Sequence, residues 1–116
     1  MDRQMKVVVV DDDRTNLMLV EMLVGKFLNC QVIPFVSARQ ALIALVDQDF
    51  DAAIVDYKMP EMDGVAFITE LRKSPRHADK PIVMVTVDKA SDVKLAALDA
   101  GAVEFLQKPI EPIEFR

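Results

Sequence analysis

The chain has almost no cysteine and no long apolar run, and these are the features that disulfides and membrane spans require. Cys30 is its one cysteine among 116 residues, so no disulfide can form within the chain, and its apolar surroundings predict a small buried side chain. No apolar run approaches the roughly 18 residues that cross a bilayer, and the run 7–10 is too short for a signal-peptide core. We therefore expect a cytoplasmic protein with no membrane segment.

Histidine is scarce as well, and negative charge outnumbers positive charge. The 14 Lys and Arg residues are outnumbered by 19 Asp and Glu residues, and the formal net charge of −5 argues against direct nucleic-acid binding by this domain. The one histidine, His77, lies in the polar, proline-containing segment 74–80, where we expect an exposed and inert side chain. It has no second histidine with which to share a metal ion.

The chain does contain a regular alternation of strand-like and helix-like segments, within a length typical of one domain. The strand-like segments are 6–10, 31–35, 52–55, 81–85 and 104–106. Apolar positions at helical spacing lie between them, in 20–27, 38–45, 64–71 and 93–100. Ser37 is a suitable N-cap for the second helix, and Gly101 a suitable stop for the fourth. Strict alternation of this kind implies a parallel sheet covered by helices on both faces.

Two segments indicate the order of the strands. Pro34 cannot donate a ladder hydrogen bond, so the strand 31–35 belongs at an edge, whereas the continuous apolar segment 52–55 belongs in the centre. These positions fit a flavodoxin-like α/β fold, a doubly wound five-stranded parallel sheet of order 2-1-3-4-5. Pro112 would open a fifth helix that is truncated at Arg116, and we therefore expect residues 1–116 to be one domain from the N-terminal part of a longer protein.

Acidic residues follow two strands that this order makes neighbours. Asp11 and Asp12 come directly after the first strand, and Asp56 directly after the third. In a doubly wound sheet, ligands bind beyond the carboxyl ends of the strands where the order reverses, here between strands 1 and 3. Carboxylates crowded there repel one another unless a hard divalent cation, typically Mg²⁺, lies among them. Asp13 is expected instead to be an acid at the N-terminus of the first helix.

Two further polar side chains are expected at the same edge of the sheet. Thr86 directly follows the fourth strand, and Lys108 follows the fifth. Acids, a hydroxyl and an ammonium group that face one cleft suit a phosphoryl group held on a carboxylate, because a metal ion and a lysine neutralise its oxygens. Such an acyl phosphate decays by hydrolysis, so the site would act as a timer and not as a turnover catalyst.

This set of residues, together with the motif D-x-x-M-P-x-M-D-G at 56–64, resembles the receiver domain of bacterial two-component response regulators, the CheY-like domain. The resemblance covers essentially the whole chain. It implies phosphoryl transfer from a phosphohistidine, on a histidine kinase or a histidine phosphotransfer protein, to Asp56. It also implies Mg²⁺ as the cofactor and a signalling role in place of enzymatic turnover.

The resemblance assigns a role to each residue of the site. Asp11, Asp12, Asp56 and the backbone carbonyl of Lys58 would bind Mg²⁺; Thr86 and Lys108 would contact the phosphoryl oxygens; and Phe105 would be an aromatic switch that follows the movement of Thr86. Dimerisation through the fourth helix, fifth strand and fifth helix is common in the family and is therefore an expectation here.

The first helix carries additional apolar side chains. Leu17, Met18, Leu19 and Met22 make it apolar nearly all round. These residues are either loosely packed core with a few exposed methionines or a docking face for the kinase or phosphotransfer partner, to which adaptable methionine side chains are suited.

Two rival functions remain open at this stage. Residues 11–15 also fit D-x-D-x-T, the nucleophile motif of haloacid-dehalogenase-type phosphatases, with Asp11 as nucleophile and Asp13 as general acid. That hypothesis leaves Asp56 unexplained, and the chain has no acidic pair after Lys108. A receiver-like interaction module that never accepts phosphate is the other alternative.

The output of the signal is a separate matter. The segment 108–116 is similar to receivers joined to cyclic-dinucleotide phosphodiesterase (HD-GYP) domains. A DNA-binding or a diguanylate cyclase output stays open.

Overall fold

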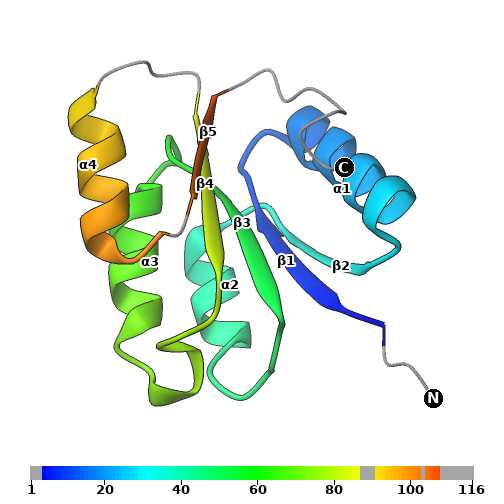
Figure 1. Ribbon diagram of the computed structural model, residues 1–116, viewed down its shortest axis with the longest axis horizontal. Helices are drawn as coiled ribbons and strands as arrows, with labels where there is room; N and C mark the ends of the chain where they lie inside the picture. The colour runs from blue at the N-terminus through cyan, green and yellow to red at the C-terminus, as the bar shows by residue number, and fades with distance from the viewer. Residues whose placement is uncertain (1–3, 87–90, 103, 108–116) are drawn as a thin grey trace.

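The structure, a computed structural model, describes residues 4–86, 91–102 and 104–107. Strands and helices alternate along this part of the chain (Figure 1). The elements are β1 (Lys6–Val10), α1 (Arg14–Leu28), β2 (Gln31–Phe35), α2 (Ala38–Ala44), β3 (Ala52–Asp56), α3 (Gly64–Arg72), the short 3₁₀ helix η1 (Pro75–His77), β4 (Ile82–Thr86), α4 (Ser91–Ala100) and β5 (Glu104–Gln107).

The strands form one parallel sheet in the order β2-β1-β3-β4-β5, which confirms the flavodoxin-like α/β architecture (Figure 1). Pro34 lies on the edge strand β2, opposite Val9 of β1, so its missing N–H leaves no gap between two central strands. The fifth helix expected from Pro112 lies outside the described residues. Among the residues that are described, no helix is long and apolar enough to cross a membrane.

The side chains of each strand alternate between two apolar layers. Val8 and Val10 of β1 belong to the larger cluster, which includes buried residues of α2, α3 and α4, whereas Val7 and Val9 belong to the cluster against α1. Figure 1 shows the same division, with α1 on one face of the sheet and α2, α3 and α4 on the opposite face. Both faces are therefore covered, and only the ends of the strands are available for a polar site.

Three side-chain caps fix where the helices begin. Asp13 accepts hydrogen bonds from the backbone N–H groups of Thr15 and Asn16 at the start of α1, as expected for a helix-terminal acid. Ser37 caps α2, and Asp63 caps α3 by accepting from the N–H of Ala66 at 2.8 Å. These three polar residues therefore fix where α1, α2 and α3 begin.

The expectation for His77 is wrong. Its side chain is 1% exposed, its ring stacks on Phe50 with the centroids 4.7 Å apart, and its Nε2–H donates to the carbonyl oxygen of Leu45 at 2.7 Å. The segment 74–80 is polar on average, but the turn of η1 directs this one ring into the apolar core, where imidazole packs as a flat aromatic body.

Arg72 joins three segments on the α3 side of the sheet. Its guanidinium group donates to the carbonyl oxygens of His77 at 2.9 Å, Lys80 at 2.5 Å and Gly101 at 2.5 Å. Burial lowers the pKa of Arg72, and the nearby Asp79 carboxylate opposes that shift. Gly101 has a φ of +116°, and a Cβ atom there would lie 2.7 Å from Nε of Arg72, so both the backbone and the neighbouring side chain require glycine.

Candidate functional site

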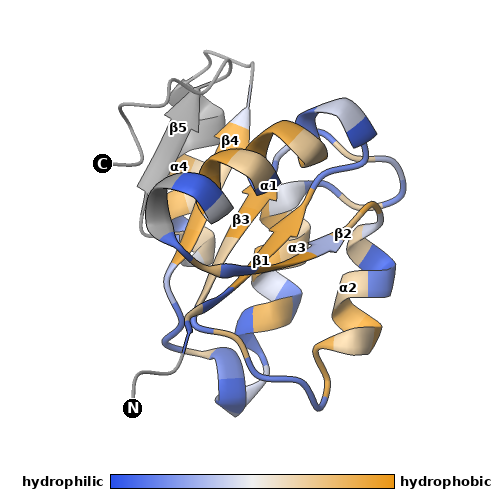
Figure 2. Ribbon diagram, turned by 90° about the vertical axis from the view of Figure 1, so that its right-hand side faces the viewer, coloured by the Kyte–Doolittle hydropathy of each residue, from blue (hydrophilic) through white to orange (hydrophobic). Residues whose placement is uncertain are grey.

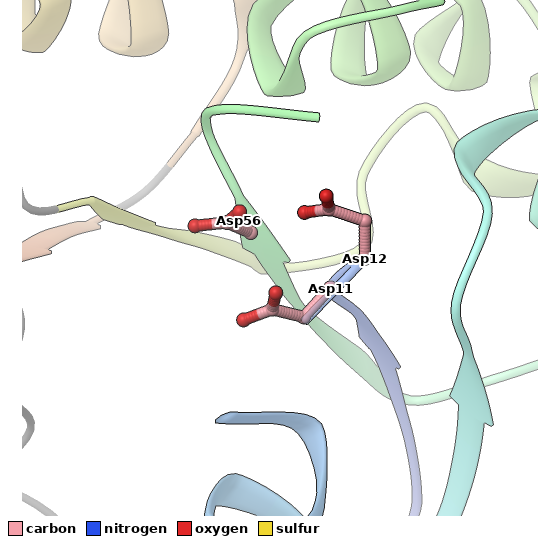
Figure 3. Close-up of side chains that lie close together, drawn as sticks. All are labelled: Asp11, Asp12 and Asp56. Atoms are coloured by element: carbon pink, nitrogen blue, oxygen red, sulfur yellow. The ribbon is translucent and has the colours of Figure 1, made fainter. Parts of the chain in front are cut away.

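The carboxylates that follow β1 and β3 converge at the carboxyl edge of the sheet. The two strands are hydrogen-bonded neighbours, with Val10 opposite Val55, so Asp11 and Asp56 emerge side by side. One carboxylate oxygen from each of Asp11, Asp12 and Asp56 lies within 4.8 Å of the others, and Figure 3 shows the three side chains extending into the same space. The sequence therefore predicted this cluster correctly.

The cluster combines two buried acids with one exposed acid. Asp11 is 3% exposed and Asp56 is 7% exposed, whereas Asp12 is open to solvent. Oxygen atoms from three carboxylates are the donor set that a hard divalent cation such as Mg²⁺ prefers, and the open side at Asp12 leaves room for water ligands. The residues present therefore fit a Mg²⁺ ion in both chemistry and spacing.

A backbone hydrogen bond orients Asp11 within this cluster. The N–H of Asp13 donates to Oδ1 of Asp11 at 2.9 Å, while the carboxylate of Asp13 caps α1 and is exposed. The phosphatase alternative needs Asp13 as a general acid beside Asp11. In the structure it is Asp56 that approaches Asp11, so the geometry gives that alternative no support.

Residues 7–116 match the family of response regulator receiver domains. The chain is a response regulator receiver domain. RpfG of Xanthomonas campestris pv. campestris, a cyclic di-GMP phosphodiesterase response regulator, is 35% identical over 116 residues, which are 99% of this chain and 31% of that protein. The two-component response regulator ORR8 of Oryza sativa is 33% identical over 109 residues, which are 93% of this chain and 89% of that protein.

Solved structures agree with this assignment. The chemotaxis protein CheY4 of Vibrio cholerae superposes with a TM-score of 0.89 at 28% identity, over 96% of this chain and 92% of that one. Receiver domains accept a phosphoryl group and act in two-component signalling, so this domain is a signalling module.

The structure gives the position of three of the other four residues that the sequence predicts at the site. Thr86 is the last residue of β4 and is 1% exposed, one position beyond Val85, which lies opposite Asp56. Lys58 is exposed in the loop that follows β3. Phe105 lies in β5 opposite Met84, and Lys108 lies outside the described residues.

The loop between β3 and α3 of this receiver domain has a tight backbone that its sequence did not reveal. Glu61 adopts a left-handed conformation, with φ +71°, and its carboxylate lies 3.1 Å from Nε of Arg39 at the start of α2. The N–H of Gly64 donates to the carbonyl of Tyr57 at 2.7 Å and closes the loop on itself. The sequence predicted a helix over 64–71, but it did not indicate that Gly64 lies against the backbone of Asp56.

Proposed function

We propose that Asp56 is the residue of this receiver domain that accepts the phosphoryl group. The observation that carries this proposal is the cluster of Asp11, Asp12 and Asp56, because a buried carboxylate beside two others is costly without a cation and becomes useful with one. Asp56 is the member that stands on the central strand β3, next to both β1 and β4. It therefore lies between the strand that precedes Asp11 and Asp12 and the strand that ends at Thr86.

The chemistry follows from the position of each group. An oxygen of Asp56 attacks the phosphorus of a phosphohistidine in line, the new O–P bond forms as the P–N bond breaks, and the imidazole leaves with the electron pair of the broken bond. Asp11, Asp12, Asp56 and the Lys58 carbonyl would hold Mg²⁺, whose charge screens the approach of two anions. The hydroxyl of Thr86 would donate to a phosphoryl oxygen, and Lys108 would pair with another.

The partner that delivers the phosphoryl group is proposed to dock on α1. Receiver domains interact with histidine kinases or phosphotransfer proteins. On α1, Leu17 is buried at 7% exposure, but Met18, Leu19 and Met22 are 69%, 41% and 57% exposed, so three large apolar side chains of the helix are open to solvent. Methionine at such a surface suits an adaptable helix–helix contact.

Separate charge substitutions test that docking face. Met18→Glu and Met22→Glu should each slow transfer from a phosphohistidine partner while leaving labelling by acetyl phosphate unchanged, because the small donor needs no docking surface. Equal losses with both donors would contradict the docking role.

Two finer features belong to the same proposal. A dimer through α4 and β5 would use Leu95 and Leu98, which are 61% and 40% exposed. Leu95→Glu should then lower the dimer fraction of the phosphorylated domain in light scattering.

The output of the signal is proposed to be a cyclic di-GMP phosphodiesterase that acts in the cytoplasm, because this chain is 35% identical to part of RpfG. An assay of phosphodiesterase activity in the full-length protein tests this output.

Binding of beryllofluoride, a phosphoryl mimic, tests the proposed acceptor. The single tyrosine, Tyr57, follows Asp56 directly, and the chain has no tryptophan, so intrinsic fluorescence reports on this position. We expect Mg²⁺-dependent binding to the wild-type domain and none to Asp56→Asn. Undiminished binding to Asp56→Asn would contradict the proposal.

A further inference from the structure

The N-terminus of α3 lies directly against the backbone that carries Asp56. A Cβ atom on residue 64 would lie 2.6 Å from the carbonyl oxygen of Asp56 and 3.0 Å from the Cα of Tyr57, closer than side chains normally approach. The N–H of Gly64 also donates to the carbonyl of Tyr57 at 2.7 Å, and the N–H of Tyr57 donates to Val85 of β4 at 2.9 Å. The peptide groups on the carboxyl side of Asp56 are thus held from both sides.

Local helix chemistry does not explain why glycine stands at position 64. Gly64 is the first residue of α3, Asp63 is already its N-cap, and alanine is favoured over glycine within helices by about 1 kcal/mol. The one described glycine with a left-handed φ is Gly101, so Gly64 does not serve to relieve a strained backbone. The close contact with the end of β3 is therefore what requires the absence of a side chain.

We infer that Gly64 is a positioning residue for phosphorylation: its missing Cβ lets α3 seat against the Asp56 carbonyl and so fixes the nucleophile within the carboxylate cluster. This inference rests on the proposed role of Asp56. A Cβ atom at position 64 would have to push the end of β3 away from α3. The three carboxylate oxygens lie within 4.8 Å of one another. A displacement of β3 therefore changes how these oxygens share a cation and how the Asp56 oxygen is aligned for attack on phosphorus.

The test measures labelling by acetyl phosphate with Mg²⁺ in Gly64→Ala beside a matched glycine substitution. Gly25 lies within α1, and a Cβ atom there would meet no heavy atom within 4 Å, so Gly25→Ala should label like wild type. We expect Gly64→Ala to be labelled at least about tenfold more slowly, since a misplacement of about 1 Å can cost about a hundredfold in rate. Ile68→Val, a buried change on the same helix, controls for loss of stability alone and should keep the wild-type rate.

A second variant separates the Asp56 contact from core packing. The same Cβ atom would lie 2.9 Å from Cε of Met84, the flexible end of a core side chain. Met84→Leu removes that atom at nearly constant volume. We expect slow labelling of Gly64→Ala to persist in Gly64→Ala/Met84→Leu, because the backbone contact with Asp56 remains.

Each other outcome overturns the inference. Wild-type labelling of Gly64→Ala, or recovery of the rate through Met84→Leu, would show that Gly64 does not act through Asp56. If Gly64→Ala fails to fold, including when it is combined with Gly25→Ala to restore stability, the residue is structural only. If the wild-type chain itself is not labelled, the proposed function fails, and the inference fails with it.

Discussion

Removal of one charge from the carboxylate cluster should make the metal-free domain more stable. At 4.8 Å, two unit charges repel by about 3.5 kcal/mol at an effective dielectric constant of about 20. Solvent at Asp12 and salt reduce this value, so we expect Asp56→Asn to raise the free energy of unfolding by about 1 to 3 kcal/mol in the absence of divalent cations. Asparagine has nearly the same shape as aspartate, which leaves the change of charge as the main difference.

Urea unfolding at low salt measures the effect, with and without Mg²⁺. Bound Mg²⁺ stabilises the wild-type domain by about 1.4 kcal/mol at ten times its dissociation constant, and this gain should shrink in Asp56→Asn. Asp13→Asn is the matched control, because Asp13 is an exposed N-cap outside the cluster and asparagine caps equally well. An Asp56→Asn variant that is less stable than wild type without Mg²⁺ would refute the account of charge repulsion.

Three further predictions concern residues outside the cluster of Asp11, Asp12 and Asp56. Arg72→Ala should lower the free energy of unfolding by about 2 to 4 kcal/mol, because three carbonyl oxygens lose a charged donor. The double variant Arg72→Ala/Gly101→Ala should lose less free energy of unfolding than the sum of the two single losses, since the methyl group added at position 101 collides with the Arg72 side chain itself. Additive losses would be evidence against this contact. Glu61→Gly should raise the free energy of unfolding by up to about 1 kcal/mol. The strain that is lost with a non-glycine residue in the left-handed region is larger than the energy of the exposed ion pair with Arg39, and a lower melting temperature would contradict this. Burial raises the pKa of the Cys30 thiol, so its contribution to stability is complete below the pKa of the unfolded thiol and is lost as pH rises through the folded pKa. The free energy of unfolding should therefore decline above about pH 8.5, near the pKa of an unperturbed thiol, and Cys30→Ala should lack this decline.

The sequence was sufficient for the features that depend on strand order. Pro34 marked the edge strand, and the acids at 11, 12 and 56 had to meet because the carboxyl ends of parallel strands share one edge. Hydropathy along the chain matches the observed layers, as Figure 2 shows for the apolar strands beneath α1. These inferences need only the period of the apolar residues and the topology they imply.

The features that depend on contacts between distant segments were not accessible from sequence. His77 was predicted to be exposed because its neighbours are polar, whereas its burial depends on Phe50 and Leu45, which lie far from it in the sequence. The role of Gly64 depends on how closely α3 approaches β3, and that distance is set by packing. The α1 surface was left between two alternatives, and both allow the observed exposure of Met18 and Met22, so a transfer assay with a phosphohistidine partner has to decide between them.

The most direct test of the account is to locate the phosphoryl group after reaction with acetyl phosphate and Mg²⁺. Borohydride reduction converts an aspartyl phosphate to homoserine, and peptide mass spectrometry identifies the residue that has changed. We predict homoserine at position 56 only when Mg²⁺ is present, and no product in Asp56→Asn. Homoserine at position 11, or labelling that does not depend on Mg²⁺, would contradict phosphorylation of Asp56 in a magnesium site.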